Sequence, residues 1–226
     1  MDIESRRIHF FERQAIGLVA ALKAEVAEDD IEAIAADAAA RFEQMVGEIP
    51  YADRPDHVMA QSVLSCYGVL AFHRPLRERG YDSHVLGRAT INSLQKFLAS
   101  MPSPDADAEM AVQNREQMRQ EALESQGAAA PDEFVFEMLQ GDADTDYGMN
   151  ILSCAICHAY GKYDAMDLVP YMCASDDTVS DAVGQGLRRT GTIALGAHHC
   201  DFRFKQNGPP RRLEEQYPDR IRLQTL

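Results

Sequence analysis

Apolar side chains recur at helical spacing through the first half of the chain, from about residue 4 to residue 127. In a first set they are separated by three or four residues: Phe11, Ala15, Leu18 and Leu22. A second set has the same period: Met59, Val63, Cys66, Leu70 and His73. This period predicts amphipathic helices, each with one buried face. Cys66 and His73 are therefore expected to be core residues.

Glycine, proline and polar residues interrupt the helical pattern. The interruptions fall at residues 47–55, 79–83 and 101–105, where turn-forming residues end one helix and precede the next. Ser83 is a candidate N-cap for the helix that follows the second interruption. Residues 1–130 are therefore expected to form a helical region of about five helices.

A different pattern begins after residue 130. Residues 134–139 alternate between two faces in the manner of a strand. Two helices and then a hairpin of two strands, turning around Gly196, are expected to follow. Their expected bounds are 148–161 and 165–183 for the helices and 187–195 and 198–205 for the strands.

This order of elements is typical of the α+β class, with a helical N-terminal half followed by a small antiparallel sheet and two helices. We expect the helices to cover one side of the sheet within one domain. Residues 131–205 would form its α+β core. Residues 206–226 are polar and contain Pro209 and Pro210, which lack backbone donors, so we expect an extended or disordered tail.

Charge and cysteine content narrow the choice of partners and compartment. The chain has 36 acidic and 22 basic residues and a net charge of -14, which repels polyanions and argues against nucleic acid and anionic membranes. The first 14 residues lack the apolar segment of a secretory signal. Five cysteines, an odd number, fit a reducing compartment. We expect a cytoplasmic protein with a small-molecule substrate, and a homo-oligomer is left open.

Cys154, Cys157 and His158 form a Cys-x-x-Cys-His run that would share one face of a predicted helix. Covalent haem attachment uses this run but requires export. Zinc is the second interpretation, since two thiolates and an imidazole are suitable ligands and Cys173 or Cys200 could be a fourth, although a second ligand pair is missing. The third is a pair of partly buried thiols that pack as small apolar groups. We favour the third and expect no cofactor, with zinc as the alternative.

Cys173 and the acidic pair Asp176 and Asp177 repeat this arrangement on the next predicted helix. If the two helices present these faces to one another, the imidazole of His158 could take the proton of the Cys173 thiol. A carboxylate there could bind an amidinium-like substrate. The alternatives are a core cysteine and an ordinary solvated helix surface.

The last predicted strand alternates with a period of two, which places Cys200, Phe202 and Phe204 on one face. Because the phenylalanine face must be buried, Cys200 is more naturally a core residue than a nucleophile. Arg189 is expected to point inward from the partner strand. Together with Arg203 it could hold a substrate carboxylate through two parallel hydrogen bonds.

Residues 189–205, which include Arg189, Thr192, Gly196, Cys200 and Arg203, resemble the closing segment of the L-2-amino-thiazoline-4-carboxylic acid hydrolase family. Three upstream blocks agree with that resemblance in order and spacing: residues 134–139, 147–154 and 171–176. The resemblance thus covers roughly residues 131–205.

The resemblance implies a hydrolase that opens a cyclic amidine of the thiazoline type by attack at the amidine carbon and cleavage of the carbon–sulfur bond. It implies catalytic roles for Cys173 as nucleophile or base partner and for Asp176 as base or amidine binder, to which we add His158 as proton shuttle. The implied substrate-binding residues are Arg189, Thr192 and Arg203. The rival hypothesis is a noncatalytic sensor that binds a small ligand or a metal in the same cysteine-rich pocket.

Overall fold

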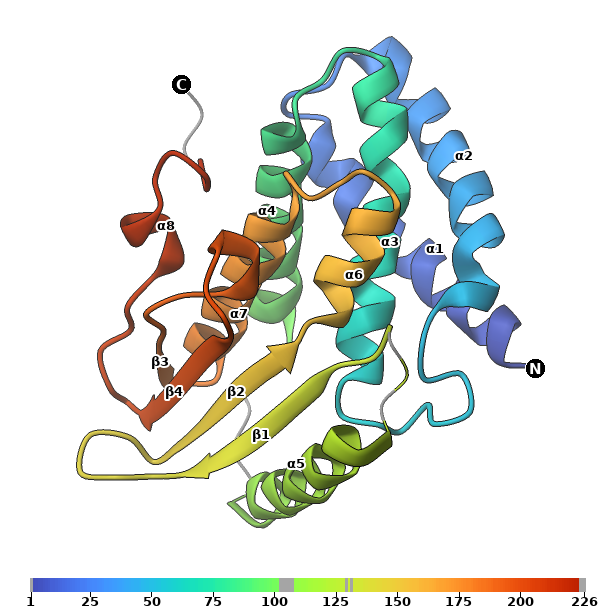
Figure 1. Ribbon diagram of the computed structural model, residues 1–226. Coiled ribbons are helices and arrows are strands. Elements are labelled where there is room, and N and C mark those ends of the chain that lie inside the picture. Colours follow the sequence, from blue (N-terminus) through green and yellow to red (C-terminus); the bar gives the residue numbers. More distant parts are fainter. Residues whose placement is uncertain (1, 102–107, 129, 131, 224–226) are drawn as a thin grey trace.

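The N-terminal half is helical, as predicted. The computed structural model describes residues 2–101, 108–128, 130 and 132–223, and places five helices among them before the first strand (Figure 1). Their bounds are α1 Ile3–Leu22, α2 Glu28–Met45, α3 Ala60–Glu78, α4 Ser83–Ser100 and α5 Ala108–Ala128. The interruption expected at 101–105 lies outside the described residues from 102 onward. The N-cap of α4 is Asp82, whose carboxylate accepts the His84 N–H, rather than Ser83.

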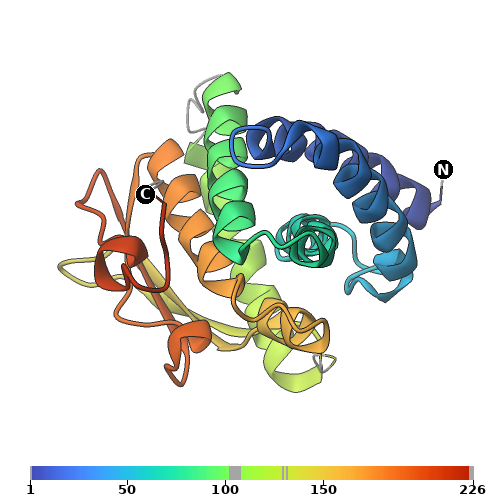
Figure 2. The ribbon, with the colours of Figure 1, turned by 90° about the horizontal axis from the view of Figure 1, so that it is seen from above.

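Helix α3 is the centre of the helical half. Viewed from above it is seen almost end-on, with α1, α2 and α4 around it (Figure 2). Four consecutive residues, Val69 to Phe72, are each at most 3% exposed. A helix that is apolar on every side can be stable only when neighbours cover every side, so α3 organises the packing of the others.

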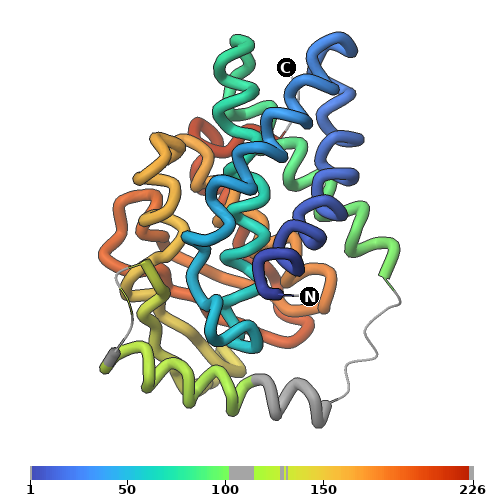
Figure 3. The backbone as a smooth tube through the Cα atoms, turned by 90° about the vertical axis from the view of Figure 1, so that its right-hand side faces the viewer, coloured from blue at the N-terminus to red at the C-terminus, as the bar shows by residue number. Residues whose placement is uncertain are grey.

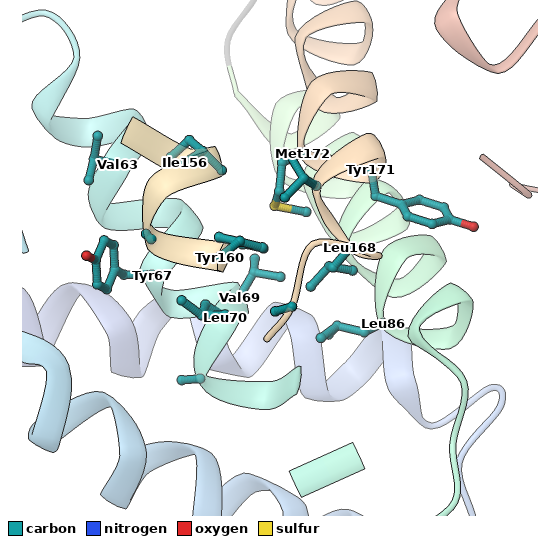
Figure 4. Close-up of a cluster of buried hydrophobic side chains, with 14 of the residues drawn as sticks. Val63, Tyr67, Val69, Leu70, Leu86, Ile156, Tyr160, Leu168, Tyr171 and Met172 are labelled. Atoms are coloured by element: carbon teal, nitrogen blue, oxygen red, sulfur yellow. The ribbon is translucent and has the colours of Figure 1, made fainter. Parts of the chain in front are cut away.

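Buried side chains join the helical half to the C-terminal part in one apolar cluster. Tyr67 and Leu70 of α3 meet Tyr160 of α6 (Ala155–Lys162) and Met172 of α7 (Val169–Ala182), and Leu86 of α4 closes the group (Figure 4). The Tyr160 hydroxyl also donates a hydrogen bond to the Cys66 carbonyl at 2.8 Å. The position of α6 relative to α3 is thereby determined.

The sheet has four antiparallel strands in the order β1-β2-β4-β3. Their bounds are β1 Val135–Gln140, β2 Tyr147–Ser153, β3 Gln185–Arg188 and β4 Cys200–Gln206. Met149 pairs with Phe202 and Ile151 with Cys200, and all four side chains are buried. The phenylalanine face of the last strand is therefore the inner face, as predicted.

Helix α5 lies apart from α1 to α4, across the end of the molecule beside β1 (Figure 3). The hydroxyl of Ser125 accepts the N–H of Phe136 at 3.1 Å and donates to the Phe136 carbonyl. These bonds satisfy backbone groups on the outer edge of β1. An edge strand with free backbone groups invites pairing with other chains, and α5 covers this part of it.

Two predicted elements differ from the structure. Residues 147–153, expected in part as helix, form β2, because Met149 and Ile151 alternate into the core and pair with β4. Strand β3 ends at Arg188, whereas the prediction extended it to residue 195. Beyond it, the carboxylate of Asp201 accepts the N–H groups of Thr190 and Gly191, so these donors leave the sheet.

The C-terminal tail contains a short helix, α8 (Leu213–Gln216), which the prediction of an extended or disordered tail did not anticipate. Leu213 and Ile221 are buried at 0% and 2% exposure. The N–H of Arg222 donates to the Tyr171 hydroxyl at 2.9 Å. The described part of the tail is therefore packed against α7. Among the described helices, none combines the length and apolar character needed to cross a membrane.

The contact between α4 and α7 predicts a specific loss of stability. A methyl group on Gly87 would lie 2.3 Å from Cγ of Tyr171, a fully buried ring. We expect Gly87→Ala to lower the free energy of unfolding by about 1–3 kcal/mol, as overpacking does. The matched control is Gly161→Ala in α6, where the nearest atom is 3.9 Å away and helix propensity favours alanine. Urea unfolding of both variants measures the difference, and equal stabilities would contradict the proposed clash.

Candidate active site

Arg189 is buried at 1% exposure directly after β3. Its guanidinium donates to Asp176 Oδ2 at 2.8 Å, to Asp177 Oδ1 at 2.6 Å and to the carbonyl of Cys173 at 3.0 Å. It also lies 4.8 Å from the centre of the Phe202 ring, a favourable cation–π position. One side chain thus connects the loop after β3 with α7 and β4. The predicted inward orientation of Arg189 is confirmed.

The two aspartates of α7 have different environments, although they are neighbours in sequence. The Asp177 side chain is 3% exposed, and its second oxygen accepts the N–H of Leu213 at 3.0 Å. The Asp176 side chain keeps 43% of its surface accessible. Burial among protein atoms nevertheless raises the pKa of Asp176 to about 6, although Arg189 acts in the opposite direction. Asp177 is therefore a structural partner of Arg189, whereas Asp176 can reach a ligand.

Four cysteines that interact with one another form what we call the thiol cluster: Cys66 of α3, Cys154 before α6, Cys173 of α7 and Cys200 of β4. The charge of Asp176 raises the pKa of Cys66, Cys173 and Cys200, and Cys154 interacts with the same three thiols. Cys154, Cys173 and Cys200 therefore interact with one another, and the shared reaction centre that the sequence suggested stays a prediction.

Burial is the main reason why these thiols are hard to ionise. It raises the pKa of Cys173 well above the ordinary value and that of Cys200 to about 12. For Cys154 a hydrogen bond with the Cys157 thiol has the largest effect, and burial adds to it. The cluster therefore consists of neutral thiols at neutral pH, and a thiolate must be generated by a base if one is used.

Two of the expected site residues lie elsewhere. His158 is exposed on α6, and the hydrogen bonds and charge interactions described for the thiol cluster do not include it. Arg203 is on the other face of β4, where it donates to Asn150 Oδ1 at 2.9 Å and to the Phe202 carbonyl. Because Arg189 and Arg203 are on opposite faces, they do not form the expected clamp for a carboxylate.

Thr192, the third expected binding residue, is fully buried. Within the part of the chain that the structure describes, its hydroxyl has no hydrogen-bond partner, and the same holds for Nε of Arg189. Buried polar groups are almost always bonded to protein or water. The expected role of Thr192 in substrate binding stays a prediction.

The Cys-x-x-Cys-His run does not have the arrangement expected for zinc. Cys154 is the N-cap of α6 and precedes the helix, while Cys157 is half-buried and His158 exposed. Across the described ranges, no three histidine, cysteine or acidic side chains are placed so that they could hold a metal ion.

Sequence reasoning also assigned Cys66 to the core alone, because its position on an apolar stripe gave no sign of the neighbouring carboxylate.

The burial of Arg189 predicts a large cost for its removal. In Arg189→Met, the buried carboxylate of Asp177 loses its counter-ion, and we expect a loss of about 3–5 kcal/mol in the free energy of unfolding. Arg203→Met is the control, because this arginine is only half-buried on the polar face. Denaturant unfolding at neutral pH measures the stability of both variants. Equally small losses in the two would contradict the central position of Arg189.

Comparison with known proteins places the site within a described family. The family model for L-2-amino-thiazoline-4-carboxylic acid hydrolase matches residues 70–204, a range that contains the whole site except Cys66. No curated protein and no solved structure gives a significant match. Because the matched range exceeds half of the chain and agrees with the resemblance seen in the sequence, this chain belongs to the L-2-amino-thiazoline-4-carboxylic acid hydrolase family.

Proposed function

We propose that this protein is a hydrolase that opens a small cyclic amidine of the thiazoline type, by attack at the amidine carbon and cleavage of the carbon–sulfur bond. One observation carries the proposal. Asp176 is a partly accessible carboxylate with a pKa of about 6, held by a buried arginine inside the matched range. Family membership supports a hydrolase, and the carboxylate supplies a group suited to start the reaction.

Asp176 would act as the general base. A pKa near 6 leaves most of the carboxylate ionised at neutral pH and makes it a better proton acceptor than an ordinary aspartate, which suits a base. Arg189 bonds to Oδ2 and so holds the carboxylate in one orientation. Among the described residues Oδ1 receives no hydrogen bond, so this oxygen can accept a proton from the attacking group.

Water is the nucleophile that the chemistry of the site favours. The pKa of Cys173 is raised well above its usual range, so its thiol would need the same base before it could attack. In the proposed step, the water oxygen bonds to the amidine carbon, the electron pair of the C=N double bond moves onto nitrogen, and one water proton passes to Asp176. The nitrogen then re-forms the double bond to carbon as the carbon–sulfur bond breaks, the departing sulfur takes the proton from Asp176, and the resulting isourea tautomerises to the urea. The sulfur leaves readily because a thiol has a pKa of only about 8.5.

The other polar groups of the site would orient the substrate. The two terminal nitrogens of Arg189 are bonded to Asp176 and Asp177. We therefore assign Arg189 the role of holding Asp176 in place, and not that of binding a substrate carboxylate. The buried hydroxyl of Thr192 is free to bond to the substrate. Cys173 would line the site beside Asp176 as a neutral thiol.

The role of Asp176 predicts a pH dependence. Because the base must be ionised, kcat/KM for 2-aminothiazoline-4-carboxylate should rise as the pH increases through about 6 and then level off. Asp176→Asn should lower kcat/KM by about 10²–10⁴-fold at neutral pH. Asp181→Asn is the matched control, since Asp181 is on the same helix and is paired with Arg212. A fully active, folded Asp176→Asn variant would exclude the proposed base.

Variants of Cys173 separate the two nucleophiles. If water attacks, Cys173→Ser and Cys173→Ala should retain turnover within about tenfold, a loss that corresponds to about 1.4 kcal/mol. A covalent adduct on Cys173 should then be absent from mass spectra of the enzyme quenched during turnover. An adduct on Cys173, together with complete loss of activity in both folded variants, would contradict attack by water. The nucleophile would then be the Cys173 thiol, with Asp176 as its base.

A further inference from the structure

Cys154 and Cys157 form a close pair of thiols at the start of α6, and the proposed hydrolysis uses neither as a reacting group. Cys154 is the N-cap, with φ -109° and ψ 110°, and its Sγ accepts the N–H of Cys157 at 3.4 Å. Interaction with the Cys157 side chain also raises the pKa of Cys154. N-caps are normally serine, threonine, aspartate or asparagine, and sulfur is a weak acceptor, so capping alone does not explain a cysteine here.

The backbone at this position allows the two sulfurs to be joined. Cβ atoms three residues apart on a helix are about 5–6 Å from one another, and a disulfide requires about 3.5–4.5 Å. Cys154 is in extended conformation outside the helix, so rotation of this residue can close the difference without unwinding α6. Ile156 and Tyr160 anchor the helix in the core, which keeps Cys157 in place.

A small oxidant can reach the pair. Both cysteines are half-buried, and their neighbours Leu152, Ser153 and His158 are exposed. The other three cysteines are on separate elements, and Cys200 is buried with its Sγ bonded to the N–H of Ile193.

From this geometry we infer that Cys154 and Cys157 are a redox-active dithiol that exchanges with low-molecular-weight disulfides to form an intramolecular disulfide. The Cys157 sulfur gives up its proton and attacks one sulfur of the small disulfide, whose other half leaves as a thiol with that proton. The Cys154 sulfur then displaces the half that is bound to Cys157. The two cysteines lose two electrons and two protons, and the small disulfide becomes two thiols.

The environment of the pair decides the order of attack. Cys154 is the N-cap, and its Sγ accepts the N–H of Cys157. The hydrogen bond with Cys157 and burial also raise the pKa of Cys154 well above its ordinary value, so we assign the second step to Cys154. Because the thiolate is the attacking species in exchange, the first mixed disulfide forms on Cys157.

Oxidation of this pair would also change the thiol cluster. Cys154 interacts with Cys173, Cys200 and Cys66, so a disulfide with Cys157 removes one neutral thiol from the surroundings of these three cysteines. The inference does not rest on the proposed ring opening, because the exchange requires only the two thiols and an external disulfide.

Disulfide mapping of the full-length protein tests this inference. The protein is equilibrated in buffers with increasing ratios of oxidised to reduced glutathione, the free thiols are alkylated, and peptides are identified by mass spectrometry. We expect a bond between Cys154 and Cys157 that excess reduced glutathione reverses. Oxidation that first joins any other pair, or five thiols that all remain open to alkylation after unfolding, would overturn the inference.

Three single variants test the order of attack. Cys154→Ser should accumulate a glutathione adduct on Cys157, whereas Cys157→Ser should not accumulate one on Cys154. Cys66→Ser is the control and should form the same disulfide as the original protein. An adduct that accumulates on Cys154 instead would overturn the assigned order. If a variant does not fold, one equivalent of phenylarsine oxide, which bridges adjacent thiols, tests the pairing on the unaltered protein. Protection of both Cys154 and Cys157 from alkylation is expected, and failure to protect them would overturn the inference.

Discussion

The buried guanidinium of Arg189 is the interaction on which the C-terminal half of this structure depends. It bonds to two carboxylates and one carbonyl of α7 and lies over Phe202 of β4. A charge that is buried without its partners costs several kcal/mol, so the loop after β3, the helix and the strand must take up their positions together. The tail joins this group through the bond from Leu213 to Asp177.

The same interaction gives two successive aspartates different chemistry. Consecutive residues on an α-helix point in directions about 100° apart, so Arg189 can bond to both while only one is enclosed. The Asp177 side chain is enclosed by protein groups, whereas Asp176 keeps an accessible surface and a raised pKa. Burial raises the pKa of Asp176 and Arg189 partly offsets that rise, while the same arginine is the counter-ion of the enclosed Asp177.

The cysteines show how environment separates residues of one type. Burial raises the pKa of Cys173 and Cys200. Because the thiolate is the reactive form, these two cysteines remain unreactive neutral thiols. The pKa of Cys154 is also raised, but this residue lies beside a second cysteine at the start of a helix. Its chemistry therefore depends on Cys157 rather than on its own ionisation.

Local periodicity alone determined the helical N-terminal half, the first strand and the buried phenylalanine face of β4. The resemblance of four sequence blocks to a known family singled out Cys173, Asp176 and Arg189. Short apolar segments such as β2 are compatible with both helix and strand, so only pairing with β4 decided between them. The tertiary structure alone decided that Arg189 is occupied by two aspartates, that Arg203 lies on the opposite face and that His158 is exposed. Burial and charge pairing depend on groups far apart in the chain, and a linear pattern does not record which of them meet.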